Sequence, residues 1–294
     1  MPGPDESSRE RRFLAGLLGA PIRHSASPAI HEAAAAALGL TFFYQLIEIA
    51  NADASRLKSV LAAIRDLGFA GINVTFPYKE AVVPHLDALA PSAQSVGAVN
   101  TVIVENDRLI GHNTDFTGFA RACRDLVRGS GPAPIALIGA GGVGKAIAAA
   151  LASHDVAEVR IFDRDPQKAI GLARSVASGR TKLTVAASLQ DALKDVAGII
   201  NGTPVGMWPN TESPIPEQYL HGGLWVADAV YFPLWTPLLL AAKKAGAKTL
   251  TGRNLILHQA ADAFRLFTGR EPPVPAMSAA FDQVMAERSQ TRPN

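Results

Sequence analysis

The chain has 294 residues, 48% of them hydrophobic and 18% charged, with a formal net charge of +2. These values favour a globular protein long enough for two domains, and they exclude a disordered chain or a broadly basic nucleic-acid binder. The single cysteine excludes an internal disulfide framework, and no apolar run approaches the roughly 18 residues of a membrane helix. Because the polar N-terminus lacks an apolar signal core, we expect a cytoplasmic protein that binds neither membranes nor nucleic acids.

The first hundred residues alternate between strand and helix patterns after a polar leader at 1–12. The patterns predict strands over 13–18, 41–49 and 69–74, helices over 28–38, 54–67 and 79–86, and a hairpin formed by 98–105 and 108–111. Ser27 is expected at the N-cap of the first helix, with Pro28 at its first position. Such alternation suggests a largely parallel sheet.

A second alternation begins with a helix before a Gly/Pro/Ser-rich break at 128–134. The patterns predict strands over 135–138, 159–162, 183–185, 198–200 and 224–227, and helices over 116–127, 143–152, 237–245, 255–267 and 277–287. The sequence therefore predicts an α/β protein with two domains.

A glycine-rich turn follows the strand at 135–138. Gly139, Gly141 and Gly144 have the spacing G-x-G-x-x-G, which permits a tight turn, close approach of a pyrophosphate and close packing of helix on strand. Asp163 follows the next strand, where an acidic side chain commonly binds the adenosine ribose 2′-hydroxyl. The same stretch also matches G-x-x-x-x-G-K, but Ala146 replaces the Ser or Thr that a P-loop needs. The pattern therefore indicates a dinucleotide site.

Polar side chains also gather where strands of the first half end. Hydroxyls, amides and one lysine occur at Ser25, Ser27, Asn73–Lys79, Asn100 and Asn113–Asp115. Ligands of parallel sheets bind beyond the carboxyl ends of strands, so these groups suit a small, polyhydroxylated anion. Helix capping by Ser27 or Asn113 and a solvated Lys79 are the alternatives. The seven histidines lack the spacing of a metal site, so we expect no metal.

Several of these stretches together resemble the shikimate dehydrogenase family, including its quinate/shikimate branch. The matching segments are GAPIRHSASPAIH (19–31), GINVTFPYK (71–79), GAVNT (97–101), NTDFTG (113–118), GAGGVG (139–144), NGTPVGM (201–207), DAVYFPLWTPLLL (228–240) and 252–269. The resemblance implies a substrate-binding catalytic domain of 13–115 plus 253–288. It also implies an inserted Rossmann-type dinucleotide-binding domain of 116–252, with flexible ends at 1–12 and 289–294.

The resemblance further implies an NAD(P)-dependent enzyme that interconverts 3-dehydroshikimate and shikimate, with Lys79 and Asp115 as its catalytic acid–base pair. The residues implied to bind the substrate are Ser25, Ser27, Thr75, Asn100, Tyr231 and Gln259. Those implied to bind the cofactor are Gly139, Ala140, Gly141, Gly142, Val143, Gly144, Asp163, Arg164, Thr203, Val230 and Gly252.

The chain departs from the family pattern at two places. Glu32 stands where Asn is usual, and we expect it on the helix surface with little effect. Asp163-Arg164-Asp165 replaces an Asn-Arg-Thr run common in NADP-using relatives. Asp163 would repel a 2′-phosphate, so we predict NAD over NADP, with NADP possible.

The resemblance leaves the choice of substrate open. The Ser25-x-Ser27 pattern favours shikimate, because quinate-selective relatives tend to carry Thr at the second position. The alternatives are a degradative enzyme acting mainly on quinate and a non-catalytic dinucleotide-sensing regulator. A methylenetetrahydrofolate dehydrogenase predicts an apolar slot instead of clustered hydroxyls. We expect a monomer or homodimer, with its role in aromatic amino acid biosynthesis or in degradation undecided.

Overall fold

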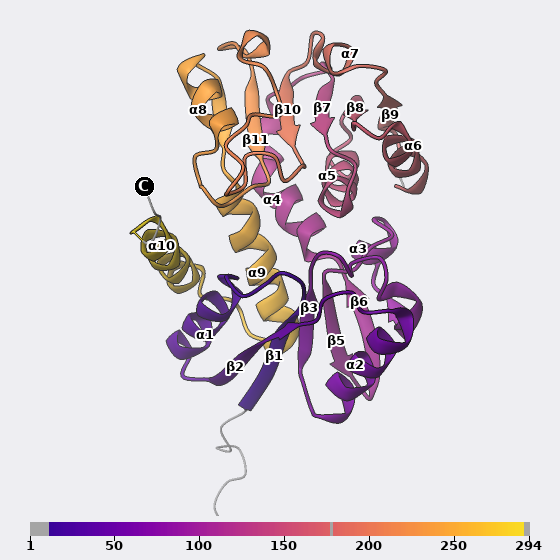
Figure 1. The fold of residues 1–294 in the computed structure, drawn as a ribbon, viewed down its shortest axis with the longest axis vertical. Coiled ribbons are helices and arrows are strands. Elements are labelled where there is room, and N and C mark those ends of the chain that lie inside the picture. Colours follow the sequence, from indigo (N-terminus) through magenta and orange to yellow (C-terminus); the bar gives the residue numbers. More distant parts are fainter. Residues whose placement is uncertain (1–11, 177–178, 291–294) are drawn as a thin grey trace, which may run out of the picture. The chain divides into compact units, whose positions relative to one another are not determined.

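The computed structural model describes residues 12–176 and 179–290 (Figure 1). It divides into two compact units, each built on a six-stranded sheet. The first unit draws on 1–88, 101–110 and 263–294, and the second on 89–100 and 111–262. The predicted flexible ends lie mainly outside the described residues, and the predicted domain boundaries at 116 and 252 stay a prediction.

The first sheet is mixed. Its strands are β1 (Arg12–Gly19), β2 (Thr41–Glu48), β3 (Gly71–Val74), β4 (Ala88–Leu89), β5 (Thr101–Glu105) and β6 (Arg108–His112), in the order β2-β1-β3-β5-β6-β4. β1 is parallel to β2 and β3, whereas β5 is antiparallel to β3. Asn106 and Asp107, with φ of 49° and 62°, form the tight turn between β5 and β6. The predicted parallel arrangement therefore holds for β1, β2 and β3, and β5 departs from it.

Two local predictions for this half were wrong. The segment predicted as a helix over 79–86 forms turns and a short 3-10 helix, η2 (Val83–His85), because Pro84 has no N–H to donate. Ser27 is the first residue of α1 (Ser27–Ala37) and not its N-cap, which is Ala26. Ser27 therefore keeps its hydroxyl for other partners.

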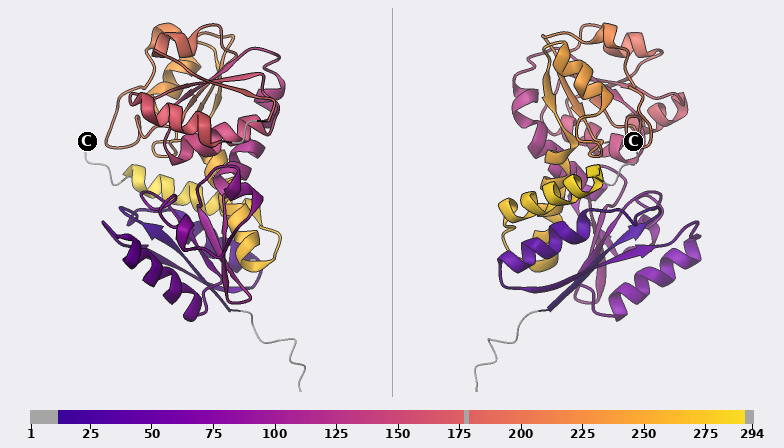
Figure 2. Two further views of the ribbon diagram at one scale, coloured as in Figure 1. Left: turned by 90° about the vertical axis from the view of Figure 1, so that its right-hand side faces the viewer. Right: turned by 60° about the vertical axis from the view of Figure 1, so that its left-hand side comes forward.

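Helices cover both faces of the first sheet (Figure 2). The remaining helices of this unit are α2 (Ala54–Asp66), the last residues of α9 (Gly252–Thr268) and α10 (Val274–Gln290). On one face, His31 of α1 lies among Phe42, Tyr44, Phe264 and Phe267, with ring centroids 4.8–6.2 Å from its own. Burial in this aromatic cluster lowers the pKa of His31 to about 3, so the side chain is neutral at neutral pH.

The neighbouring Glu32 lies on the helix surface as predicted, but it is not without effect. Its carboxylate accepts a hydrogen bond from the Tyr44 N–H of β2 at 3.1 Å. Because β2 is an edge strand, this contact satisfies a backbone donor that would otherwise face solvent.

The second sheet is parallel and doubly wound. Its strands are β7 (Ile135–Ile138), β8 (Glu158–Phe162), β9 (Lys182–Val185), β10 (Gly198–Asn201), β11 (Trp225–Asp228) and β12 (Lys248–Leu250), in the order β12-β11-β10-β7-β8-β9. All five neighbouring pairs are parallel. The order reverses direction between β7 and β10, which is where doubly wound sheets bind their ligands. The predicted α/β fold with a Rossmann-type sheet is confirmed.

Two apolar cores lie against this sheet. The helical elements of the unit are α3 (Pro91–Gln94), α4 (Thr114–Arg128), α5 (Gly142–Ala152), α6 (Pro166–Ser175), α7 (Leu189–Leu193), η3 (Glu217–Tyr219), α8 (Pro237–Lys244) and the first part of α9. In β7, Ile135 and Leu137 pack with α4, α5 and α6, whereas Ala136 and Ile138 pack with α7 and α8. This alternation follows from the two-residue period of a strand.

The sequence patterns missed the short elements β4, β12, α3 and α7, each of five residues or fewer, and also the ten-residue helix α6. A few residues carry too little periodicity to be recognised. Within the described residues, we find no helix with both the length and the apolar character that crossing a bilayer requires.

Candidate active site

The glycine-rich turn joins β7 to α5. Gly139 has a φ of +100°, and a Cβ on Gly144 would lie 2.2 Å from the Gly139 carbonyl oxygen. Neither position therefore accepts a side chain. A Cβ on Gly141 would meet no atom within 4 Å, and Gly141 is the N-cap of α5. The open space at a helix N-terminus fits the pyrophosphate of a dinucleotide.

Asp163 follows β8 and is held against this turn. Its Oδ2 accepts a hydrogen bond from the Ala140 N–H at 2.8 Å, and its Oδ1 accepts one from the Asp165 N–H at 2.9 Å. The two bonds fix the carboxylate beside the glycine turn, and each oxygen retains a lone pair for a ligand hydroxyl. Arg164, the next residue, is exposed.

The remaining predicted cofactor residues follow the other strands of the same sheet. Thr203 follows β10 and Val230 follows β11, while Gly252 begins α9 soon after β12. A Cβ on Gly252 would lie 2.4 Å from the Val230 carbonyl oxygen, and one on Gly139 would lie 2.6 Å from Thr203 Cγ2. All the predicted cofactor residues therefore lie along the carboxyl edge of one parallel sheet.

A buried carboxylate lies under this edge. Asp228, the last residue of β11, is 3% exposed and accepts hydrogen bonds from Asn201, Val230 and Thr236. Burial raises the pKa of Asp228 to about 6, although the three donors oppose that rise.

Three predicted substrate residues also belong to the second unit. Asn100 exchanges hydrogen bonds with Thr114, accepting from its N–H at 2.6 Å and donating to its Oγ1 at 2.9 Å. Thr114 in turn donates to Gln259 Oε1 of α9 at 3.4 Å. Asn113 caps α4 by accepting from the Phe116 N–H, which leaves Asp115 in the first turn of that helix. The capping alternative for Asn113 is thus correct.

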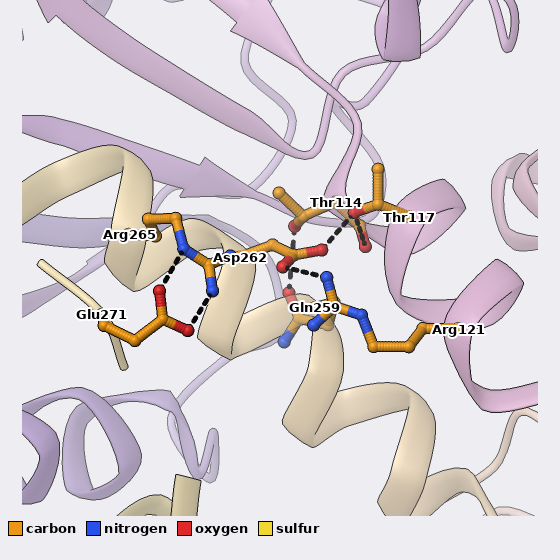
Figure 3. Close-up of polar contacts among 7 residues, drawn as sticks. All are labelled: Thr114, Thr117, Arg121, Gln259, Asp262, Arg265 and Glu271. Carbon is orange, nitrogen blue, oxygen red and sulfur yellow. Dashed lines mark hydrogen bonds and ion pairs between the residues drawn. The ribbon is translucent and has the colours of Figure 1, made fainter. Parts of the chain in front are cut away.

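A second polar cluster joins α4 to α9 one helical turn further on (Figure 3). The Asp262 carboxylate accepts hydrogen bonds from the Thr117 hydroxyl and, at 2.8 Å, from Arg121. Gly118 lies between these residues, and a Cβ on it would be 2.7 Å from the Gln259 backbone nitrogen. Close approach and a partly buried ion pair therefore hold Gln259 against α4. Figure 3 also draws the exposed Arg265–Glu271 ion pair, which belongs to the first unit.

Two serines of the first unit lie at the start of α1. The Ser25 hydroxyl donates to Ser27 Oγ at 3.1 Å and accepts from the Ser27 N–H at 3.2 Å. Tyr44 of β2 is 6% exposed, and burial raises the pKa of its phenol. Tyr44 donates to Asn73 Oδ1 at 2.7 Å, and Asn73 donates to Thr101 Oγ1 at 2.9 Å. Tyr44, Asn73 and Thr101 therefore form a buried chain of uncharged groups across β2, β3 and β5 of this unit.

The predicted lysine lies on the turn that follows β3. Tyr78, which is 3% exposed, donates its hydroxyl to the Ile49 carbonyl at 2.6 Å and accepts from the Ala52 N–H at 2.9 Å. These bonds anchor the turn that carries the half-buried Thr75 and Lys79. A Cβ on Gly19 would lie 2.4 Å from Thr75 Cγ2, so the loops after β1 and β3 are in direct contact.

The structure thus groups the predicted residues by unit. Ser25, Ser27, Thr75 and Lys79 lie at the carboxyl edge of the parallel strands of the first unit. The other predicted residues belong to the second unit, including Asp115 and the half-buried Tyr231 after β11. Lys79 and Asp115 therefore belong to different units.

Sequence patterns assigned no role to the residues that hold these side chains: Tyr44, Tyr78, Thr114, Asn201 and Asp228. Two signals were available. A carboxylate ends the buried strand WVAD (225–228), and an aromatic hydroxyl directly precedes Lys79.

Three family models match successive parts of the chain. Residues 17–102 match the shikimate dehydrogenase substrate binding domain, 125–205 match shikimate / quinate 5-dehydrogenase, and 257–280 match the shikimate 5′-dehydrogenase C-terminal domain. The shikimate dehydrogenase (NADP(+)) of Streptomyces avermitilis is 43% identical, over 88% of this chain and 91% of its own. The chain belongs to the shikimate dehydrogenase family.

Family members named for either cofactor are similar to this one. The quinate/shikimate dehydrogenase (NAD(+)) of Corynebacterium efficiens is 40% identical, over 92% of this chain and 97% of its own. Among solved structures, quinate dehydrogenase from Corynebacterium glutamicum in complex with NAD has a TM-score of 0.84 and 38% identity, covering 92% of this chain and 99% of that one. Shikimate 5-dehydrogenase from Thermus thermophilus in complex with NADP(H) and shikimate has a TM-score of 0.82 and 35% identity, with the same coverage. The predicted family is confirmed.

Proposed function

We propose that this member of the shikimate dehydrogenase family interconverts 3-dehydroshikimate and shikimate with a nicotinamide dinucleotide. The observation that carries the proposal is the first unit's carboxyl edge, where two hydroxyls at a helix N-terminus and a half-buried lysine accompany Thr75. These residues lie within 17–102, the range that matches the substrate binding domain of the family. In this proposal the substrate-binding domain comprises 13–115 with 253–288, and the dinucleotide-binding domain comprises 116–252.

Hydroxyl and amide groups account for the binding of the acid. Ser25 and Ser27 donate to its carboxylate at the positive end of the α1 dipole. Thr75, Asn100, Tyr231 and Gln259 hydrogen-bond its ring oxygens. A site built of such groups disfavours acids that lack the hydroxyls, because its buried polar atoms would then lose their partners.

Lys79 and Asp115 act as the acid–base pair. The bound nicotinamide supplies or accepts the hydride. When the substrate carbonyl oxygen gains negative charge, the Lys79 ammonium stabilises it and delivers a proton, and Asp115 orients the ammonium or exchanges that proton. The bonds of Tyr78 to Ile49 and Ala52 support this role, because they anchor the turn that carries the lysine.

The proposed cofactor is NAD in preference to NADP. Both oxygens of Asp163 are oriented by backbone N–H groups, which favours a fixed carboxylate able to accept from ribose hydroxyls. A 2′-phosphate at the same position would meet this negative charge and that of Asp165. Arg164 is exposed and offers partial compensation, so we expect residual use of NADP.

Quinate is the second candidate substrate. It is favoured by the similarity to the NAD-dependent quinate/shikimate dehydrogenase of Corynebacterium efficiens. Ser27 supports shikimate, because this position tends to be Thr in quinate-selective relatives.

Steady-state oxidation of shikimate and of quinate, each with NAD and with NADP, tests the proposal. We expect the largest kcat/KM for shikimate with NAD. Turnover of neither acid with either cofactor would overturn the proposed activity. A larger kcat/KM for quinate would select the second candidate, and a preference for NADP would overturn only the argument from Asp163.

A further inference from the structure

A pair of buried side chains lies at the carboxyl edge of the second sheet. Asn201 and Asp228 are the last residues of β10 and β11, and they face each other in the parallel register of these strands. Asn201 is fully buried and Asp228 is 3% exposed. An amide and a carboxylate at such depth require hydrogen-bond partners, and those partners reveal what the pair holds.

Asp228 binds the loop that follows its own strand. Its Oδ1 accepts from the Val230 N–H at 2.9 Å, and its Oδ2 accepts from the Thr236 hydroxyl at 2.7 Å. Thr236 also caps α8 by accepting from the Leu239 N–H. The carboxylate therefore fixes both ends of the segment 229–236, which contains the predicted cofactor residue Val230 and the predicted substrate residue Tyr231.

Asn201 does the same for the neighbouring loop. Its Oδ1 accepts from both the N–H and the hydroxyl of Thr203, at 2.9 Å and 2.6 Å. Its Nδ2 donates to the Val205 carbonyl at 3.1 Å and to Asp228 Oδ1 at 3.0 Å. The hydrogen bond between Asn201 and Asp228 therefore ties the two loops together beneath Thr203 and Val230.

We propose that Asp228, acting through Asn201 and Thr236, is the positioning residue for the nicotinamide half of the dinucleotide site. The adenosine half is held by different bonds, those of Asp163 with Ala140 and Asp165. This inference rests on the proposed function: the glycine turn and Asp163 serve the pyrophosphate and the adenosine ribose, which leaves the implied cofactor residues Thr203 and Val230, after β10 and β11, for the nicotinamide. It goes further, because it assigns the geometry of one half of the site to one buried group that does not touch the ligand.

The test compares a whole dinucleotide with one that lacks the nicotinamide. NAD and ADP-ribose are titrated calorimetrically into the wild type and into Asp228→Asn. The substituted carboxamide keeps the size of the side chain but replaces one acceptor oxygen with an NH₂ group. We expect the Kd for NAD to rise on the order of tenfold, because a hydrogen bond to a charged group is lost. The Kd for ADP-ribose should stay within about twofold, since its contacts lie in the other half.

Three further variants test for a general effect on the sheet. Glu158→Gln changes a carboxylate at the amino end of β8, at the opposite edge of the same sheet, and should leave both affinities unchanged. Thr236→Val removes the hydroxyl that donates to Asp228, whereas Thr236→Ser retains it. Valine should reproduce the selective loss of NAD affinity and serine should restore it, even if Asp228→Asn does not fold.

The inference would be overturned if the folded variants bound NAD and ADP-ribose with equally raised Kd values, or if the Kd for NAD did not rise. Failure of the proposed function gives a different result, because the wild type would then bind neither ligand, or would bind NAD and oxidise neither shikimate nor quinate. If NADP binds more tightly than NAD, NADP and 2′-phospho-ADP-ribose replace the two ligands, and the expected difference is the same.

Discussion

The two sheets support their ligand-facing edges with different chemistry. In the first unit, Tyr44, Asn73 and Thr101 form a chain of uncharged hydrogen-bonding groups. In the second unit, the carboxylates Asp163, Asp228 and Asp262 each accept bonds from N–H or O–H donors.

The difference matches the ligand proposed for each edge. Neutral donors at a helix N-terminus suit an anionic acid, whereas a fixed carboxylate suits ribose hydroxyls and disfavours added phosphate. The two units also differ in the buried group that changes its charge with pH. Buried His31 must stay neutral in the first, while buried Asp228 carries a charge at neutral pH in the second. Each variant below alters one side of this contrast and leaves the other as an internal control.

The largest effect is expected from Lys79→Met, which removes the proposed proton donor from the first unit. We expect kcat to fall by about 10²–10⁴, the usual contribution of a placed acid or base, with a smaller change in KM. NAD affinity, which depends on the second unit, should not change. Lys58→Met, an exposed lysine of α2, is the matched control and should retain full activity. A kcat within a few-fold of the wild type would contradict the assignment.

Acid should act on the two units in opposite directions. His31 has a folded pKa of about 3, so the unfolded state binds its proton first and the first unit loses stability below pH 6.5. The loss should reach roughly 2–3 kcal/mol by pH 4.5. Asp228, with a folded pKa of about 6, contributes stability that grows as the pH falls from 6 towards 4.

Denaturant unfolding between pH 7.5 and 4.5 separates these contributions. All three tryptophans lie in the second unit, so their fluorescence reports that unit while far-UV circular dichroism reports both. The variant His31→Leu should lose much less unfolding free energy between pH 7.5 and 4.5 than the wild type, whatever the stability of the variant at pH 7.5. The same pH slope in His31→Leu and the wild type would contradict the role of the buried imidazole.

An intermediate effect is expected from Asp163→Asn in the second unit. Removal of the negative charge should lower the ratio of kcat/KM for NAD to that for NADP by about tenfold, which corresponds to 1.4 kcal/mol. The KM for shikimate should stay constant, because Asp163 lies beside the glycine turn and is not among the residues proposed to bind the acid. Asp191→Asn, an exposed acid of α7, is the control. An unchanged cofactor ratio would refute the repulsion argument.

The smallest effect is expected from Tyr44→Phe, which deletes one hydroxyl from the uncharged chain of the first unit. Asn73 Oδ1 then loses its donor in β3, just before the turn that carries Thr75, so the KM for the acid should rise about three- to tenfold, in line with one neutral hydrogen bond. The Kd for NAD should be unaffected. A change in NAD affinity equal to the change in KM would mean that the two edges are not independent.

Local patterns in the sequence were enough to predict most of the long helices and strands, and the cofactor residues at the carboxyl edge of the second sheet. Gly139, Gly141, Gly144 and Asp163 are recognisable because backbone geometry and helix packing demand those residue types at short, regular spacing. The helix predicted over 79–86 failed at Pro84, and the N-cap predicted at Ser27 moved to Ala26. Local sequence signals can therefore conflict, as helix periodicity and Pro84 do over 79–86.

Tertiary structure alone decided which side chains support the site. Asn201 meets Asp228 only because β10 and β11 end side by side, 27 residues apart in sequence. Tyr44 and Asn73 are separated by 29 residues, and Thr114 and Gln259 by 145. No short-range pattern encodes such pairs, because they depend on strand order and helix docking. The sequence alone therefore indicates which loop residues bind ligands, whereas the residues that hold those loops in place are identified only in the tertiary structure.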